Sequence, residues 1–348
     1  MSRARVGTLD AMTRRERRTL SIRPKTRVFL VATALVLLAI AAAGCGRSGS
    51  SGTTATAAAG GGTGSSNLSG RIEADGSSTV GPLVTAAAED FQAANPNVHV
   101  TVGISGTGGG FERFCKGETD ISDASRPIKP DEEAPVCKQN NIEYTEFQVA
   151  NDGIALVVNK EDTWAKCLTV EQLKKIWEPN SKVDNWNKVD SSFPDQKMTL
   201  AGPGTDSGTF DFFTKEINGE EDASRTDYQA TEDDNVTVQA VEGDKGGLGY
   251  FGLSYFEQNQ GNLNDVEVDS GSGCVAPTTE TVQDGSYTPL SRPLFVYVKK
   301  TSLQKPEVKA FIKYLLDNEE ALTKKALFVP LTAEQLQKSQ SDFQAATS

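Results

Sequence analysis

The sequence predicts an α/β protein with two lobes. From Arg71 onward, short apolar segments alternate with amphipathic helical segments, which is the pattern of α/β folds. The chain has 348 residues, more than one ordinary hydrophobic core accommodates, and without its ends it suits two domains of about 100 to 150 residues each. With 37% hydrophobic residues and 32 glycines, the composition is that of a globular protein.

The expected strands and helices follow one another in a regular order. Each strand-like segment is apolar and each helical segment has one apolar face, in the order 99–105 and 110–117, 154–159 and 169–177, and 292–300 and 306–327. The last of these segments reads as one closing helix or a pair of helices. Residues 219–235 are acidic and polar, and we expect them on a solvated loop or helix face.

The distribution of charge and the scarcity of histidine exclude several function classes. Residues 1–44 hold nine of the 35 Lys+Arg and two of the 47 Asp+Glu, which leaves a net charge of about −19 for the rest. Nucleic-acid binding depends on basic residues that neutralise phosphates, so we expect no nucleic-acid partner. His99 is the single histidine, and we therefore expect no histidine-based metal site and no cofactor.

The first 44 residues have the pattern of a signal peptide. Basic residues precede the apolar run 28–43, which ends in Ala42-Ala43-Gly44-Cys45. This run of 16 residues is shorter than the roughly 20 that span a bilayer, although an uncleaved membrane anchor remains the alternative. Small residues before Cys45 indicate a lipoprotein signal, with alanine at 42 where leucine is usual. We therefore expect Cys45 to be lipidated at the extracytoplasmic face of the membrane.

The cysteines beyond Cys45 predict disulfides rather than a metal site. Residues 45–69 are rich in Gly, Ser, Thr and Ala and read as a flexible tether. After them come four cysteines, an even number in an exported chain, with no CxxC spacing typical of zinc or thiol redox sites. Three pairings are possible, and the order along the chain favours Cys115 with Cys137 and Cys167 with Cys274.

Four Gly/Ser/Thr-rich segments each lie where a strand passes into a helix. We call them the first to fourth turn, and they span 75–82, 105–114, 120–128 and 202–213. A helix N-terminus offers unpaired N–H donors and partial positive charge, and glycine lets an anion approach closely. One such turn is usually a helix cap, but four in one chain indicate an anion site. Phe111 replaces the third glycine of a dinucleotide-binding motif, and no P-loop is present.

The turn sequences GSSTVGP, SGTGGGF, DASRPI and GTDSGTF resemble, in this order, the substrate-binding subunits of bacterial phosphate ABC importers. The resemblance covers about residues 70–335. It implies a periplasmic-binding-protein type II fold, with lobe 1 formed by 70–150 plus 290–345, lobe 2 by 151–289, and the ligand cleft between them. It further implies binding of inorganic phosphate for delivery to permease and ATPase subunits, in a lipid-anchored protein that we expect to be a monomer.

The resemblance also implies a set of ligand-binding residues. Taken turn by turn, they are Ser78 and Thr79, Thr107 and Gly108, Ser125 and Arg126, and Ser207, Gly208 and Thr209. Better-known relatives have an aspartate at the position of Ser125 and an arginine at that of Pro203, so Arg126 would supply the guanidinium, which can hold two oxygens.

A carboxylate near the anion would provide selectivity. Monohydrogen phosphate carries a proton that a carboxylate can accept, whereas sulfate has none and would leave that carboxylate unpaired. Asp206 or Asp152 could serve, with Asp123 as a weaker candidate. If no carboxylate reaches the ligand, selectivity for phosphate over sulfate is not expected.

Alternative functions stay open at this point. The turns would also suit another tetrahedral oxyanion or a phosphonate. A surface phosphatase could use them too, but it would need a general base, and His99 lies in an exposed-looking strand. A sensor or adhesion protein could retain the fold without transport. Outside the turns, we expect Arg113 to form an ion pair and Arg292 to be structural.

Overall fold

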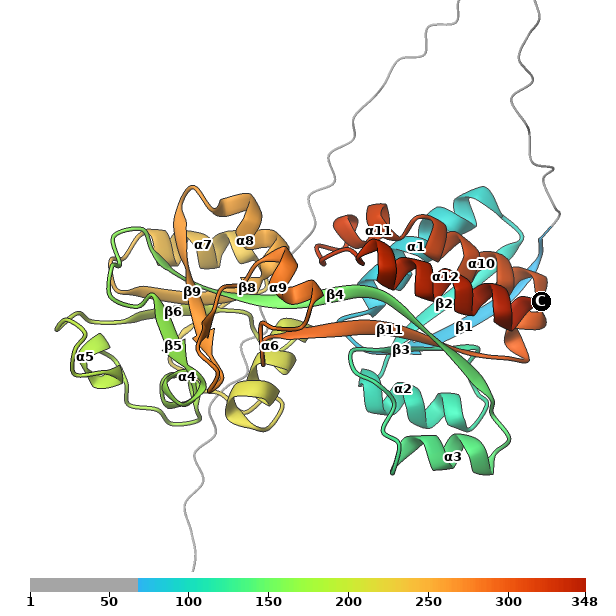
Figure 1. Ribbon diagram of the computed structural model, residues 1–348, viewed down its shortest axis with the longest axis horizontal. Helices are drawn as coiled ribbons and strands as arrows, with labels where there is room; N and C mark the ends of the chain where they lie inside the picture. The colour runs from blue at the N-terminus through green and yellow to red at the C-terminus, as the bar shows by residue number, and fades with distance from the viewer. Residues whose placement is uncertain (1–67) are drawn as a thin grey trace, which may run out of the picture. The chain divides into compact units, whose positions relative to one another are not determined.

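The computed structural model describes residues 68–348 (Figure 1). The predicted signal peptide over 1–44, the lipidation of Cys45 and all but the last two residues of the 45–69 tether lie outside the described residues. Within them, no helix is long and apolar enough to cross a membrane.

Eleven strands and twelve α-helices alternate along the described chain. The strands are β1 (Gly70–Gly76), β2 (Val98–Ile104), β3 (Ile121–Ala124), β4 (Tyr144–Asn159), β5 (Cys167–Thr169), β6 (Thr199–Gly202), β7 (Gln229–Ala230), β8 (Gly247–Gly252), β9 (Leu263–Asp269), β10 (Cys274–Val275) and β11 (Ser291–Lys299). The helices are α1 (Gly81–Ala94), α2 (Gly106–Cys115), α3 (Glu133–Gln139), α4 (Val170–Trp177), α5 (Trp186–Val189), α6 (Gly208–Phe213), α7 (Asp234–Glu242), α8 (Leu253–Asn259), α9 (Thr279–Gln283), α10 (Pro306–Asp317), α11 (Glu319–Lys325) and α12 (Ala333–Thr347).

Local sequence explains where several of these helices begin. Three helices begin with a capping threonine: Thr169, Thr278 and Thr332. Each threonine hydroxyl accepts a hydrogen bond from the amide three residues later, and the side chain of that later residue accepts one from the threonine amide. In α4 the apolar residues recur at helical spacing, so that Leu173 and Ile176 are fully buried on one face. The predicted strand and helix segments, which rest on short-range patterns of this kind, are confirmed. The closing segment forms the pair α10 and α11.

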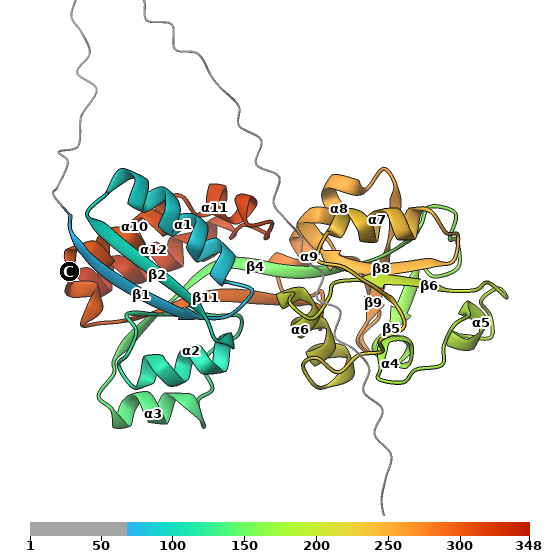
Figure 2. The same cartoon turned by 180° about the vertical axis from the view of Figure 1, so that it is seen from behind.

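Lobe 1 is built on the strand order β2-β1-β3-β11-β4. The first three strands are parallel, and β11 returns antiparallel between β3 and β4. Helices α1, α10, α11 and α12 cover one face, and α2 and α3 cover the other (Figures 1 and 2). Each face has its own apolar cluster, the larger containing Phe91 and Phe311 with ring centroids 5.4 Å apart.

Lobe 2 continues the sheet from β4 through β8 and β6 to β7, with β9 also paired to β4. Its core is a third apolar cluster centred on aromatic rings. Phe213 stacks on Tyr250 at 3.9 Å, and Trp177 meets Tyr250 edge-on at 5.0 Å. The two-lobed α/β architecture is therefore as predicted, while the exact lobe boundaries near 150 and 290 stay a prediction.

Two long strands connect the lobes. β4 and β11 run side by side between the two groups of elements (Figures 1 and 2). They are hydrogen-bonded from Tyr144 and Lys299 at one end to Gly153 and Ser291 at the other, with one register shift next to Leu294. A bulge of this kind bends a strand and increases its twist.

The two predicted disulfides are confirmed. Cys115 and Cys137 join the end of α2 to α3, with a separation of 22 residues in sequence. Cys167 and Cys274 join β5 to β10 in lobe 2, with a separation of 107 residues. All four sulfurs are therefore engaged in covalent bonds and none offers a thiolate to a metal ion.

Candidate functional site

A cleft of about 790 Å³ lies where the connecting strands meet the two lobes. Its walls come from the first, second and third turns, from α6 and the π-helical turn after it (Thr214–Asn218), and from the start of β11. Segments separated by more than 200 residues in sequence thus face a common space.

The first turn presents its polar side chains because its backbone is held from behind. The amide of Ser77 donates to the carbonyl of Asp123 at 2.9 Å, and the Ser77 hydroxyl accepts bonds from the amides of Thr79 and Val80. Gly76 is required here, since a Cβ atom would lie 2.1 Å from the Asp123 carbonyl oxygen. Ser78 and Thr79 are left to line the cleft.

The second and third turns are joined to each other. The hydroxyls of Thr107 and Ser125 lie 3.0 Å apart, and the amide of Ser125 donates to the Thr107 hydroxyl at 3.2 Å. Helix α2 begins at Gly106, whose φ of 76° suits glycine, and no side chain caps it. The amides at the N-terminus of α2 therefore offer backbone donors to the cleft, beside Gly108 and Gly109.

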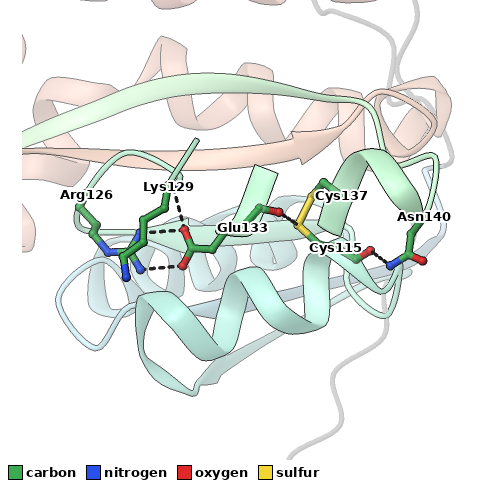
Figure 3. The surroundings of a disulfide bond; sticks show 6 residues. All are labelled: Cys115, Arg126, Lys129, Glu133, Cys137 and Asn140. Carbon is green, nitrogen blue, oxygen red and sulfur yellow. Dashed lines mark hydrogen bonds and ion pairs between the residues drawn. A yellow bond between two sulfur atoms is a disulfide. The ribbon is translucent and has the colours of Figure 1, made fainter. Parts of the chain in front are cut away.

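Arg126 lines the cleft but is held end-on by a carboxylate. Its two Nη atoms donate to the two carboxylate oxygens of Glu133, at 2.9 and 2.7 Å (Figure 3). The same carboxylate accepts the amide of Lys129 at 2.8 Å. The hydrogen bonds that Arg126 donates to Glu133 raise the pKa of Arg126, whose side chain is 35% exposed. The Nη1–Nη2 end of the guanidinium, one of its two bidentate edges, is thus occupied, while Nε has no hydrogen-bond partner within residues 68–348.

The fourth turn contributes differently from the expectation. The hydroxyl of Ser207 caps α6 by accepting the amide of Thr209 at 3.2 Å, and neither residue lines the cleft. Asp206 is exposed and also lies outside the lining. Gly208 lies close to the first turn, because a Cβ atom there would be 2.6 Å from the Thr79 hydroxyl oxygen.

One turn further along α6, Asp211 and Phe212 reach the cleft instead. The Ser78 hydroxyl donates to the carboxylate of Asp211 at 3.3 Å, a bond between the two lobes. Burial, chiefly, and the nearby Asp222 raise the pKa of Asp211, and burial also raises the pKa of Glu216 in the same wall. Charged groups of both signs therefore line the cleft.

Arg292 lies at the base of the cleft, where β11 pairs with β4. Its Nε donates to Asp152 at 3.1 Å, and its Nη2 donates to the Thr79 hydroxyl at 2.8 Å and to the Gly208 carbonyl at 3.4 Å. The guanidinium stacks over the ring of Phe212 at 3.8 Å. Asp152 thus contacts this arginine from outside the cleft lining.

Comparison with known proteins identifies the family. A model of the PBP superfamily domain matches residues 53–319. Protein SphX of Synechococcus elongatus is 46% identical over 266 residues, which cover 76% of this chain and 78% of SphX. The phosphate-binding protein PstS of Staphylococcus haemolyticus is 43% identical, over 73% of this chain and 78% of PstS. This chain belongs to the phosphate-binding-protein family of the PBP superfamily.

A solved structure agrees with this family assignment. The crystal structure of a possible phosphate binding protein from Planctomyces limnophilus has a TM-score of 0.78 and 45% sequence identity, and the match covers 81% of this chain and all of that one. The two-lobed fold expected for the family is therefore the fold of this chain.

Of the eleven predicted ligand residues, nine taken from the family and two carboxylate candidates, six line the cleft and five do not. Those in the lining are Ser78, Thr79, Thr107, Gly108, Ser125 and Arg126, and those outside it are Asp152, Asp206, Ser207, Gly208 and Thr209. Their role in ligand binding stays a prediction.

Sequence reasoning missed Arg292 and Asp211 as cleft residues. One signal for Arg292 was present, because Ser-Arg-Pro occurs twice, at 125–127 and at 291–293, and both copies line the cleft. For Asp211 the signal was helical spacing. Asp211 lies one turn beyond the cap Ser207 on the same helix, so the turn that positions the cap also positions the carboxylate.

Proposed function

We propose that this protein binds inorganic phosphate outside the cytoplasm and delivers it to the permease and ATPase subunits of an ABC importer. The observation that carries the proposal is the convergence of three predicted anion turns and two arginines on one cleft. A chain with a net charge of −12 would repel anions overall, so local donors must provide the attraction. The family relationship supports the same function, since curated relatives are named phosphate-binding proteins.

The cleft has the groups needed to replace the water shell of one tetrahedral anion. The hydroxyls of Ser78, Thr79, Thr107 and Ser125 and the uncapped start of α2 supply neutral donors. Arginine supplies the charge, and a closed site in which water is excluded makes each such bond stronger. No covalent step is needed for capture and delivery.

The proposal includes the site of action. Cys45, once lipidated, would hold the protein on the outer face of the membrane, and residues 45–69 would let the monomeric receptor reach its permease. A phosphatase is the less supported alternative, because His99 stands at the start of β2 opposite Arg71, outside the cleft lining.

Calorimetric titration of the phosphate-stripped protein with phosphate and sulfate tests the proposal. We expect phosphate to bind at micromolar concentration or below, and sulfate much more weakly. Absence of phosphate binding at micromolar concentration would reject it. Tighter binding of arsenate, a phosphonate or sulfate would assign the cleft to another anion, and turnover of a chromogenic phosphate ester that is lost in Ser78→Ala would indicate the phosphatase.

Within this function, we assign the proton-accepting role to Asp211. It is a cleft carboxylate bonded to Ser78, and burial already raises its pKa, so a neighbouring second negative charge without a proton would be strongly disfavoured. Monohydrogen phosphate can donate its proton to this carboxylate, whereas sulfate cannot. Of the two main sequence-based candidates, Asp206 is exposed and outside the lining, and Asp152, also outside it, is bonded to Arg292.

Asp211→Asn should therefore reduce the ratio of phosphate to sulfate affinity by about tenfold or more, because the amide can donate to either anion. Competition titrations of phosphate and sulfate on the variant and the wild type measure this ratio. The same titrations with Asp206→Asn decide between the candidates, and a reduced ratio in that variant alone would return the role to Asp206.

A further inference from the structure

Two arginines line the cleft, but their donors are used differently. Both Nη atoms of Arg126 are committed to Glu133, and one of them also donates to the Pro127 carbonyl. Arg292 uses Nε and Nη2, whereas its Nη1 has no hydrogen-bond partner within residues 68–348. A guanidinium has five N–H donors, so Arg292 keeps both Nη1 hydrogens for a ligand, whereas Arg126 keeps Nε and one Nη2 hydrogen beside a carboxylate that already pairs with it end-on.

The two arginine side chains also differ in how deeply they are buried. Arg292 is 14% exposed and its partner Asp152 is 9% exposed, compared with 35% for Arg126. Removing a cation from water is costly, and Asp152, the one carboxylate bonded to the guanidinium, offsets only part of this cost, with Asp211 and Glu216 adding attraction from nearby. An anion placed against the remaining donors would offset more of it, and the attraction would be less screened than at Arg126.

The position of Arg292 relates it to both lobes. It contacts Thr79 in the first turn, Gly208 at the start of α6, and the ring of Phe212. Its backbone belongs to β11, paired with β4 at Asp152. An anion bound here would lie at the point where both walls of the cleft and both connecting strands meet.

We propose that Arg292, rather than Arg126, supplies the principal positive charge that binds the tetrahedral anion, with Asp152 holding the guanidinium in position through Nε. This assignment rests on the proposed phosphate-binding function. Arg126, locked by Glu133, then forms the outer wall of the site and contributes donors rather than the main charge.

Phosphate titration of matched variants by calorimetry tests the assignment. Arg292→Lys keeps the charge but loses the planar fork, and it should weaken phosphate binding about tenfold or more, while Arg292→Gln should weaken it about a hundredfold or more. Arg126→Lys should weaken it less than about fivefold. Arg71→Lys is the control, since Arg71 is exposed in β1 outside the cleft lining, and the affinity of this variant should equal that of the wild type.

A measurement on the wild type keeps the test independent of variant folding. The Nε–Hε signals of Arg292 and Arg126 can be followed by ¹⁵N NMR during phosphate addition, with the arginine variants providing the assignments. We expect the Arg292 signal to shift at saturation by more than the Arg126 signal.

The outcomes separate the two proposals. Wild-type protein that binds no phosphate would overturn the proposed function and this assignment together. Wild-type binding combined with unchanged affinity in Arg292→Lys and a large loss in Arg126→Lys would overturn only the assignment to Arg292. A shift confined to the Arg126 signal would do the same.

Discussion

At the end of β3, the carboxylate of Asp123 is enclosed by protein on every side. It is fully buried, and within the described residues neither of its oxygens has a hydrogen-bond partner. Burial, and to a lesser extent the nearby Asp75, raise the pKa of Asp123 to about 7. The main-chain carbonyl of Asp123 accepts the amide of Ser77 and so supports the first turn. Ionisation of its buried side chain carries an energetic penalty in the folded state.

This penalty predicts a pH dependence of stability. The native carboxyl binds its proton more tightly than the unfolded one, whose pKa is near 3.9, so stability should fall as pH rises between about 4 and 7. Above pH 7 ionisation of Asp123 should lower the free energy of unfolding by about 4 kcal/mol relative to its value at low pH. Asp123→Asn cannot ionise and should lose this part of the slope, which urea unfolding of phosphate-free protein at several pH values measures.

The exposed Asp131 in the following loop provides the control. Asp131→Asn should retain the wild-type dependence on pH. An unchanged slope in Asp123→Asn would show that this buried carboxylate is not the source.

Replacing Gly208 by alanine should affect phosphate binding rather than folding. A Cβ atom there would lie 2.6 Å from the Thr79 hydroxyl oxygen and 3.2 Å from the Ser78 hydroxyl oxygen. Gly208→Ala should keep α6 and the first turn apart and weaken phosphate binding about tenfold or more, with little change in unfolding temperature. Titration calorimetry and thermal unfolding measure the two quantities. Gly261→Ala, where the added atom meets open space, should leave both unchanged.

Part of the cleft lining could be predicted from the sequence. The turns that carry Ser78, Thr79, Thr107 and Ser125 were predictable from a local pattern of glycine, serine and threonine, and the family resemblance selected these residues within them. The setting of Arg292 was not, since its partner Asp152 is 140 residues away and the pairing exists only through the register of β4 and β11.

At the scale of elements, the Cys115–Cys137 disulfide connects two helices that both serve the cleft. Helix α2 begins in the second turn and ends at Cys115, and α3 begins at Glu133, which holds Arg126, one turn before Cys137 (Figure 3). The disulfide therefore fixes the far end of the unit that positions Arg126. The Cys167–Cys274 disulfide joins strands of lobe 2 and no part of it lines the cleft.

Replacing each pair of cysteines by serine should give different results. Loss of the Cys115–Cys137 bond, which closes 22 residues, should cost about 3 kcal/mol of stability and also weaken phosphate binding severalfold. Loss of the Cys167–Cys274 bond, which closes 107 residues, should cost about 5 kcal/mol and leave the affinity unchanged. Urea unfolding and titration of both variants measure these effects. Equal affinities in the two variants would contradict a role of the first disulfide in positioning Arg126.

Elements were predictable where periodicity was strong, as in β2, α4 and the α10–α11 pair. The fourth turn was located correctly as a strand-to-helix boundary, with β6 before it and α6 after it. Which residues of this segment face the cleft was not predictable, because the rotation of α6 about its axis decides that Asp211 and Phe212 line it while Ser207 serves as the cap. Burial of Phe213 in the core cluster of lobe 2 holds α6 in this rotation.

For the whole molecule, the cleft predicts a common response of both lobes to ligand. Phosphate at 100 times its dissociation constant should stabilise the native state by about 2.7 kcal/mol. Because the lining comes from both lobes, scanning calorimetry should show the entire transition moving to higher temperature with phosphate. Sulfate at the same concentration should move it much less. A scan in which only one of two transitions moved would contradict a site shared by the lobes.

The paired strands β4 and β11 limit how the receptor can rearrange. Two strands bonded to each other from Tyr144 and Lys299 to Gly153 and Ser291 can twist and flex as a ribbon, whereas sliding past one another would break many backbone bonds at once. We therefore expect the lobes to approach and separate by bending and twisting of this ribbon rather than by sliding of one strand along the other. Ligand binding would then change the surface offered to a membrane transporter through the separation and relative rotation of the two lobes.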